Sequence, residues 1–260
     1  IYSINKLINS ENISHIYLHT PVASSLIRLS TILRLFNKNR PKIIYHVHGY
    51  RFYNKIYYPK KLIFLILEFI LSFTTEYYIT INKYDFNFSK IFKFWNTKKV
   101  FFVNGVGVEK NKIIPYLIKN KLRQKPHIIG TIGSYNKEKG YDCLIETSGI
   151  LEKNNCIFKC FGAGDYNYYQ EKAKSKNIIF NSFVKEIEKE IAQFEVLFLP
   201  SQREGLNVSL QEALFLGIPV VTSTSRGCID VVNNEKIKYV FITNNAIRAS
   251  QLILEIIEMD

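Results

Sequence analysis

The sequence predicts an α/β fold made of two doubly wound αβα domains. Along its 260 residues, short runs rich in β-branched and aromatic residues alternate with amphipathic runs of helical length. Strands separated by helices imply parallel sheets with right-handed crossovers. The alternation is interrupted at 111–126, where two prolines and five basic residues occur. We therefore expect one domain over 1–113, a linker over 114–126 and a second domain over 127–260.

In the first domain, β-rich runs predict four strands separated by three helices. The expected strands are 14–18, 42–47, 76–82 and 99–103, and the expected helices are 22–37, 59–74 and 84–95. The most apolar run, 62–73, is 12 residues long and contains Glu68. A bilayer span needs roughly 20 apolar residues, so this run is expected to form a core or interfacial helix.

The second domain continues the same pattern. The expected strands are 127–133, 156–161, 177–180, 195–199, 218–222 and 238–242, and the expected helices are 140–153, 166–175, 184–193, 207–216 and 244–258. Ligands of such sheets bind in the loops beyond the carboxyl ends of the strands. Where two such domains face each other, the cleft between them is the natural site.

Charge is distributed unevenly. Of the net +13, residues 1–125 carry 21 Lys and Arg against 5 Asp and Glu, whereas 126–260 carry 14 against 17. The two parts are therefore expected to have different partners. Nucleic acid is not an expected partner, because no helix-turn-helix, RRM or KH pattern is present and the best motif lies in the acidic part. A general surplus of surface lysine accounts for part of the charge.

The cysteines and the first residues of the chain limit the classes of protein to which it can belong. All four cysteines lie in the second domain without a C-x-x-C pair, which predicts reduced, buried thiols in a cytoplasmic protein. Disulfide scaffolds and zinc fingers are thereby excluded. No secretory signal is visible, and the sequence begins with Ile1 and not Met, so we expect an N-terminal truncation.

The most informative segment is the loop and helix at 199–217. Gly205 lets the backbone approach a ligand, and the free amides that open the helix form an anion site. Glu204 and Glu212 lie on either side of that site, and each carboxylate can accept hydrogen bonds from vicinal hydroxyls. A phosphate between two polyhydroxyl groups describes a nucleotide sugar. The alternative is that both glutamates face solvent and merely favour the helix N-terminus.

This segment resembles the Glu-x7-Glu motif of the retaining glycosyltransferases of the GT-B fold, in the group often called family 4. The similarity extends over most of 13–235. The matching donor-domain segments are TIGSYNKEKGYDCLIE, CIFKCFGAGD and NIIFNSFV, and the acceptor-domain segments are IYLHTPVASSLIRLS, IIYHVHGY, YYITINKYD and FFVNGVGVEK. INKYD with GVGVE is most similar to enzymes of capsular and exopolysaccharide assembly. The resemblance implies two Rossmann-like domains facing across a cleft, the acceptor side first and the nucleotide-sugar donor side second.

The resemblance also implies roles for the residues of the long loop and helix. Glu212 would bind the ribose hydroxyls, and Glu204 would bind the donor hexose in a catalytic position. The backbone amides around Gly205, Leu206 and Asn207 would hold phosphate and sugar. Asn207 is in addition a good N-cap by its residue type.

Further donor-side residues follow from the first and second loops. Lys139 would contact the diphosphate as a catalytic residue, and a lysine at a helix start does suit an anion there, although a solvated lysine is the alternative. The family places an arginine after the strand-ending glycine, whereas Gly133 is followed here by Ser134, so that Lys137 or Arg203 would have to substitute.

Two more positions complete the predicted nucleotide-binding set, which already includes Gly133 and Ser134. Gly162 begins a weak G-x-G match, which implies a close turn facing the nucleotide or, alternatively, a plain strand–helix turn. Val184 ends the third matching donor segment.

Histidines cluster in the first domain. His46 and His48 alternate at the end of a strand and should share a face. With His19 they could bind zinc, but no acidic or cysteine ligand is close in sequence, so no metal site is predicted. The family's histidine before a small residue lies in the cleft beside the reacting sugar, a catalytic position that His48 fits and His19 adjoins. For His15 and His46 we expect core or capping roles.

An anionic membrane surface is a further expected partner, in addition to the nucleotide sugar. Lys60 and Lys61 open the predicted helix 59–74 and follow Arg51 and Lys55 in an aromatic loop. Cations and aromatics beside an apolar helix suit an anionic bilayer and a lipid diphosphate headgroup. We therefore expect a peripheral protein on the cytoplasmic face of the inner membrane.

The resemblance as a whole implies a retaining transferase that moves a hexose from a nucleoside diphosphate sugar, expected to be a UDP-sugar, to a lipid-linked saccharide. The nucleotide sugar is then a substrate, and neither a cofactor nor a metal is expected. One alternative is a non-catalytic nucleotide-sugar-binding subunit. Another is an inactive fragment that needs a partner, because family members begin with an additional strand and Gly-rich loop that nothing before Ile1 supplies.

Overall fold

A computed structural model of the chain describes residues 2–11, 13–32, 40–51, 58–94, 99–105, 107–117, 125–232 and 239–259. It forms two compact units, unit 1 (Ile1–Val106) and unit 2 (Gly107–Asp260). The expected helix end at 33–37, the aromatic loop at 52–57 and much of the expected linker lie outside the described residues. Assignment of unit 1 to an acceptor and of unit 2 to a donor remains a prediction.

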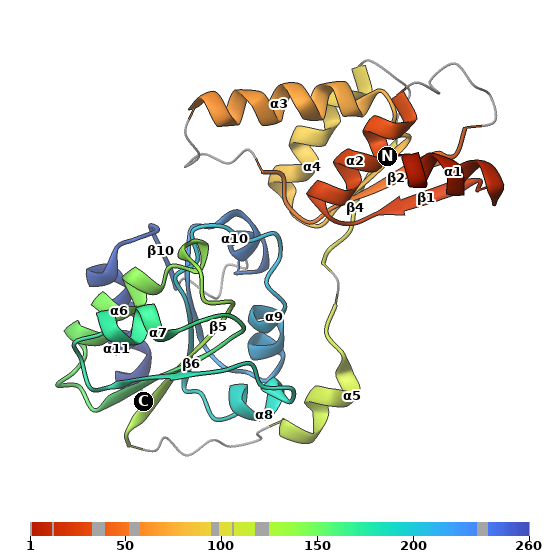
Figure 1. The fold of residues 1–260 in the computed structure, drawn as a ribbon. Coiled ribbons are helices and arrows are strands. Elements are labelled where there is room, and N and C mark those ends of the chain that lie inside the picture. Colours follow the sequence, from red (N-terminus) through yellow and green to blue (C-terminus); the bar gives the residue numbers. More distant parts are fainter. Residues whose placement is uncertain are drawn as a thin grey trace. The chain divides into compact units, whose positions relative to one another are not determined.

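Unit 1 contains a parallel four-stranded sheet in which consecutive strands are neighbours (Figure 1). Its strands are β1 (His15–Leu18), β2 (Lys42–Val47), β3 (Tyr77–Thr80) and β4 (Lys99–Phe102). Its helices are α1 (Tyr2–Ser10), α2 (Pro21–Ile32), α3 (Tyr58–Ser72) and α4 (Lys83–Ser89), the last continued by the 3-10 turn η1 (Lys90–Phe94). Alternate residues of β2, Ile43, Tyr45 and Val47, are buried in the core, as the period of a strand requires.

A buried ion pair joins α2 to α3 inside unit 1. The Arg28 guanidinium donates to the two carboxylate oxygens of Glu68 at 2.6 and 3.0 Å. The same guanidinium lies 4.2 Å from the ring centroid of Tyr45 on β2, a cation–π contact. Glu68 therefore stands in an apolar helix because it neutralises a buried arginine.

Unit 2 contains a parallel six-stranded sheet in the order β10-β9-β8-β5-β6-β7. Its strands are β5 (His127–Ile132), β6 (Cys156–Phe161), β7 (Ile178–Asn181), β8 (Val196–Leu199), β9 (Val220–Ser223) and β10 (Val240–Phe241). The chain builds outward from β5 in one direction through β6 and β7, and then returns to β8 on the other side. The switch point of this doubly wound sheet lies between β5 and β8, where sheets of this kind bind their ligands.

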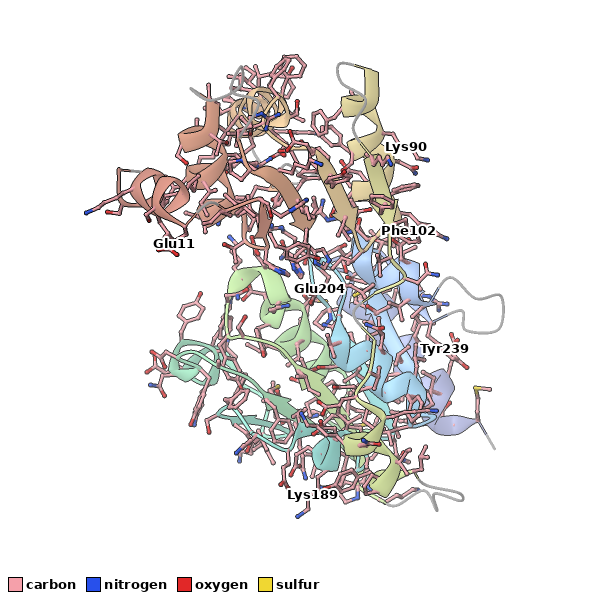
Figure 2. All side chains as sticks on the ribbon, turned by 90° about the vertical axis from the view of Figure 1, so that its right-hand side faces the viewer. Glu11, Lys90, Phe102, Lys189, Glu204 and Tyr239 are labelled. Carbon is pink, nitrogen blue, oxygen red and sulfur yellow. The ribbon has the colours of Figure 1, made fainter. Side chains whose placement is uncertain are left out.

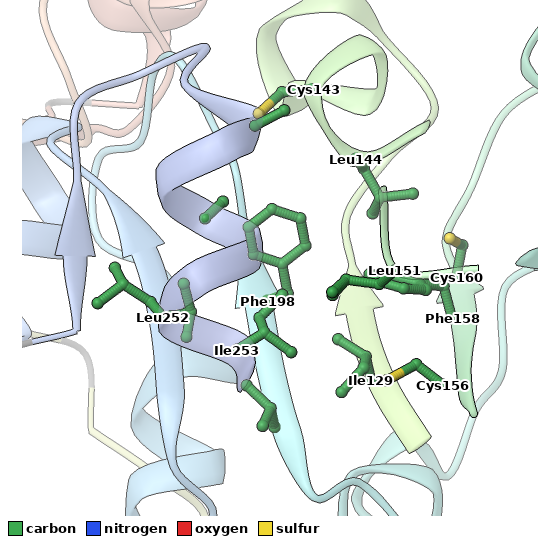
Figure 3. Close-up of a cluster of buried hydrophobic side chains, with 14 of the residues drawn as sticks. Ile129, Cys143, Leu144, Leu151, Cys156, Phe158, Cys160, Phe198, Leu252 and Ile253 are labelled. Atoms are coloured by element: carbon green, nitrogen blue, oxygen red, sulfur yellow. The ribbon is translucent and has the colours of Figure 1, made fainter. Parts of the chain in front are cut away.

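Helices cover both faces of the unit 2 sheet (Figure 1). They are α5 (Lys110–Ile113) with η2 (Ile114–Tyr116), η3 (Lys137–Lys139), α6 (Tyr141–Ile150), α7 (Asn167–Lys172), α8 (Ile187–Ile191), α9 (Val208–Phe215), α10 (Arg226–Val232) and α11 (Ala246–Glu258). Figure 3 shows one face, where Phe198 of β8 packs with Leu252 and Ile253 of α11. On the other face, Leu210 of α9 packs against β8 and β9.

Each predicted strand is found, whereas three short helices were not predicted from the sequence. These are α1, α5 and α10. The sequence of α10, RGCIDVV, combines a glycine with β-branched residues and spans seven positions, so local propensity for a helix is weak. The four cysteines are buried and free, which confirms the prediction of reduced thiols.

Candidate functional site

Two loops meet at the switch point of unit 2. The loop after β5 runs through Gly133 to Lys139, and the loop after β8 runs from Pro200 to Asn207. The backbone N–H of Gln202 donates to the carbonyl of Glu138 at 2.8 Å and holds the loops together. Figure 2 shows Glu204 at one end of unit 2 and Lys189 at the opposite end.

The Glu204 carboxylate is the centre of a buried polar network. Its Oε1 accepts hydrogen bonds from Lys139 Nζ at 2.8 Å, from Ser201 Oγ at 2.8 Å and from Asn207 Nδ2 at 3.1 Å. Glu204 itself is only 7% exposed. Because charge and hydrogen bonds both compensate the buried carboxylate, its position is fixed, as a group that orients a substrate must be. The structure thus brings together the predicted residues Lys139, Glu204 and Asn207.

Helix α9 begins where the sequence predicts. The Asn207 side chain caps it, since Oδ1 accepts from the Leu210 backbone N–H at 2.9 Å while Nδ2 donates to Glu204. Gly205 and Leu206 are partly exposed in the turn before it. The amides of the first helical turn therefore open beside the Glu204 network, where an anion is favoured.

Glycines allow the loops to approach each other closely. A Cβ on Gly162 would lie 1.9 Å from the carbonyl oxygen of Gly133, so no other residue fits without displacement. The Lys139 side chain in turn passes over Gly133, where a Cβ would lie 3.2 Å from its Cδ. Gly140 has a φ of +75° and approaches the Pro200 carbonyl. The glycine backbone thus guides Lys139 toward Glu204, while nucleotide contacts of Gly133 and Gly162 remain predictions.

The position of the expected family arginine is exposed. Ser134 accepts a hydrogen bond from Asn136 Nδ2 at 2.7 Å, and Lys137 is exposed on η3. Arg203, the other proposed substitute, donates to both oxygens of Glu138 at 3.2 Å. Of the two substitutes, Lys137 has the more accessible charge.

Glu212 occupies different surroundings, in the second turn of α9. It is half-buried, and this burial raises the pKa of its carboxyl above the ordinary value; nearby Glu188 of α8 raises the pKa further, and Lys112 of α5 opposes both. Val184, also half-buried, precedes α8 and packs against the apolar cluster that includes Ile191 of α8. Two of the predicted nucleotide-binding residues, Glu212 and Val184, therefore lie near α8, whereas Glu204 lies beside Lys139.

Sequence reasoning missed two supports of this site. Ser201 donates directly to Glu204 and accepts through its carbonyl from Ser223 Oγ at the end of β9. A Cβ on Gly227 of α10 would lie 2.1 Å from the carbonyl oxygen of Gly205. The signal in the sequence was the run of small residues after β9, which permits this close packing.

In unit 1, His48 lies with His19 and His46 at the carboxyl ends of β1 and β2; His19 and His48 follow the two strands, and His46 is the penultimate residue of β2. His19 Nδ1 and His48 Nε2 are 3.1 Å apart. Burial lowers the pKa of His46 to about 4 and also lowers the pKa of His48; the neighbouring imidazoles add to both effects. His15 is not part of the group, since it contacts Ser14.

Comparison with known proteins identifies the family. The family model of glycosyl transferases group 1 matches residues 115–260. Among curated relatives, a putative glycosyltransferase EpsD of Bacillus subtilis is 25% identical, with 89% of this chain and 64% of the relative covered. The UDP-Gal:alpha-D-GlcNAc-diphosphoundecaprenol alpha-1,3-galactosyltransferase of Escherichia coli is 23% identical, with 90% and 64% covered. The chain thus spans less than two thirds of their length.

Solved structures share the fold at low identity. Sucrose-phosphate synthase from Thermosynechococcus elongatus has a TM-score of 0.76 at 12% identity, with 98% of this chain and 67% of that chain covered. Anabaena Alr3699/HepE, solved in complex with UDP and glucose, has a TM-score of 0.75 at 15% identity, with 98% and 71% covered. These neighbours are GT-B glycosyltransferases, and the parallel sheets agree with the predicted Rossmann-like architecture. With the family match extending over more than half of its residues, this chain belongs to the glycosyl transferases group 1.

Proposed function

We propose that the protein transfers a hexose from a nucleoside diphosphate sugar, a UDP-sugar in particular, to a lipid-linked saccharide during polysaccharide assembly. The Glu204 network carries this proposal, because a fixed carboxylate beside a lysine and a helix N-terminus provides contacts for sugar hydroxyls and diphosphate together. Relatives whose names include O-antigen and capsular polysaccharide biosynthesis support a role in polysaccharide assembly. A structural neighbour was solved in complex with UDP, which supports uracil as the base of the proposed donor.

The donor would lie along the carboxyl ends of β5 and β8. Glu212 would accept hydrogen bonds from the ribose hydroxyls near Val184, and Glu204 would accept from the hexose. Lys139, held at 2.8 Å from Glu204, would share its remaining N–H donors with the diphosphate. As the bond from the anomeric carbon to the phosphate oxygen breaks, charge builds on the diphosphate, and Lys139 with the first amides of α9 would stabilise it.

The transfer proposed is retaining, with no protein nucleophile assigned. His48 would act on the acceptor side, where its imidazole can hydrogen-bond to the sugar hydroxyls. His48→Ala is then expected to lower turnover more than donor affinity. The name of the Escherichia coli relative includes a sugar linked through a diphosphate to a lipid, and we propose an acceptor of the same class for this protein.

Attachment to an anionic membrane surface would be through α3. Five large apolar side chains on one side of this helix are exposed, Leu62, Ile63, Ile66, Phe69 and Ile70, while Glu68 and Leu71 face the interior. Lys60 at the start of the helix is also exposed. An exposed apolar stripe with basic residues at its end is the pattern of an interfacial helix. Among the described helices, none is long and apolar enough to cross a bilayer.

A donor and acceptor panel tests the proposal. The protein is incubated with UDP-, GDP- and TDP-sugars and a polyprenyl-diphosphate saccharide, and the products are identified by mass spectrometry. Transfer from a UDP-sugar with retained anomeric configuration is the expected result. Donor binding without transfer would favour a non-catalytic subunit, and absence of nucleotide binding would overturn the proposal.

Attachment to lipid is measured separately by sedimentation with vesicles. Ile63→Asp combined with Ile66→Asp should reduce binding to vesicles containing an anionic lipid, whereas Val208→Asp, at an exposed apolar position of unit 2, should not. Equal sedimentation of both variants with the wild type would contradict a role for α3.

A further inference from the structure

Three histidines from two neighbouring strands converge in unit 1. Strands β1 and β2 pair in parallel with Leu18 opposite Tyr45, so His19 and His46 follow one position later on each strand. His48 lies two residues beyond His46 and, by the period of a strand, on the same side. Residues 29 positions apart in sequence are thereby brought side by side.

The ring nitrogens lie at the spacing of a metal site. One nitrogen from each imidazole lies within 4.8 Å of one from each of the other two. His19 Nδ1 and His48 Nε2 are 3.1 Å apart, close to the ~3.3 Å that separates two nitrogens bound at about 2.05 Å to one tetrahedral zinc ion. Ring centroids of His46 and His48 are 4.3 Å apart, so a modest rotation of side chains suffices to complete the set.

The contacts of His46 indicate which of its two ring nitrogens is available to a metal. Its Nδ1 is 3.3 Å from the hydroxyl of Tyr17, while its Nε2 is buried without a hydrogen-bond partner. If Nδ1–H donates to the Tyr17 oxygen, the Nε2 lone pair is free for a metal. A ligating histidine ordinarily donates its other N–H to a neighbouring oxygen in this manner. A metal would also remove the cost of the unpaired buried nitrogen.

We propose that His19, His46 and His48 bind one divalent transition-metal cation of the zinc type, with solvent at the fourth position. Imidazole nitrogens suit zinc, copper and nickel, whereas magnesium and calcium require oxygen ligands. The candidate cluster contains no carboxylate, so the selectivity follows from the donor atoms alone. The sequence alone did not favour this site because no acidic or cysteine ligand lies close to the three histidines, whereas three protein ligands with solvent at the fourth position suffice for zinc.

The site has a consequence for activity that rests on the proposed function. His48 is the proposed acceptor-side residue, and a bound cation would occupy its ring nitrogen. Micromolar Zn²⁺ should then inhibit transfer, and His46→Ala should relieve the inhibition. Binding itself is independent of this consequence and is measured without any sugar substrate.

Zinc competition measures the site directly. The full chain, freed of metal by dialysis against a chelator, is titrated with Zn²⁺ in the presence of a coloured zinc indicator. One ion per chain is expected, and His46→Ala, His19→Ala and His48→Ala should each weaken the affinity by about 100-fold. Tyr17→Phe, which removes only the hydrogen-bond partner of His46, should weaken it by about 10-fold.

His15→Ala is the matched control, because His15 lies on β1 four residues before His19, is exposed, and contacts Ser14 outside the cluster. It should bind zinc as the wild type does. Co²⁺ in place of Zn²⁺ should give the visible absorption of a tetrahedral ion, which His46→Ala should abolish. Circular dichroism establishes that each variant is folded. Wild-type affinity no greater than that of His46→Ala, or an equal loss in His15→Ala, would overturn the proposal.

Discussion

Lys139 and Glu204 are 65 residues apart in sequence and joined by a hydrogen bond of 2.8 Å between Nζ and Oε1. The contact links the loop after β5 to the loop after β8, on either side of the switch point of the unit 2 sheet. Glu204 is buried and Lys139 partly exposed. The ammonium group can therefore turn one side to the carboxylate and another to a ligand.

Lys139→Met should weaken the binding of UDP by at least about 10-fold, since hydrogen bonds to charged groups contribute roughly 1.5–3 kcal/mol. Isothermal titration calorimetry with UDP measures this. Lys153→Met is the control, because Lys153 is exposed in the turn after α6, away from the loops after β5 and β8. Its affinity should stay within about two-fold of the wild type. Equal losses in both variants would indicate a general charge effect and not a specific contact.

Donor affinity should depend on pH through Glu212. Burial and the nearby Glu188 raise the pKa of its carboxyl. In the proposed complex the ionised form would accept hydrogen bonds from the ribose, so that binding would be lost as pH falls through the pKa, and the raised pKa would move that loss toward neutral pH. UDP affinity of the wild type should therefore fall more steeply from about pH 7 to about pH 5 than that of Glu212→Gln.

The phosphate of UDP also titrates in this range, but it does so equally for both proteins. The difference between the two slopes thus isolates Glu212. Glu171→Gln, at an exposed position of α7, should retain the wild-type slope. Parallel slopes in wild type and Glu212→Gln would contradict a role for this carboxylate in binding.

Strands, the start of α9 and the loop pair around Glu204 could be predicted from the sequence because each has a local signal. Buried strands are apolar runs, and Asn207 is a cap by residue type. The partners of those residues could not be predicted, because Ser201 and Gly227 matter only through residues that the fold brings near. For the three histidines the sequence predicted the grouping but not the distances, since strand register brings His19 Nδ1 within 3.1 Å of His48 Nε2.

Gly227→Ala should disturb the loop that holds Glu204. The added Cβ would lie 2.1 Å from the carbonyl oxygen of Gly205, so α10 or the loop must move, at a cost of about 1–3 kcal/mol. Urea unfolding and UDP titration should both show a loss. Gly149→Ala is the matched control, because a Cβ there meets nothing within 4 Å and alanine favours a helix by about 0.5 kcal/mol. A stable Gly227→Ala protein with unchanged UDP affinity would show that this packing is dispensable.

The ion pair between Arg28 and Glu68 should dominate the stability of unit 1. Glu68→Ala leaves the fully buried guanidinium without its counter-charge, and breaking such a pair costs about 3–5 kcal/mol. Urea unfolding followed by far-ultraviolet circular dichroism measures the loss of stability.

Replacement of both partners separates charge burial from packing. Arg28→Met with Glu68→Leu removes the two charges together and keeps much of the apolar volume, so it should unfold at higher urea than Glu68→Ala alone. If the double variant is no more stable than Glu68→Ala, the loss comes from the contacts of the side chains with α2, α3 and Tyr45. If it approaches the wild type, the unpaired guanidinium is the cause, and the pair determines how α2 and α3 pack more than how tightly they do so.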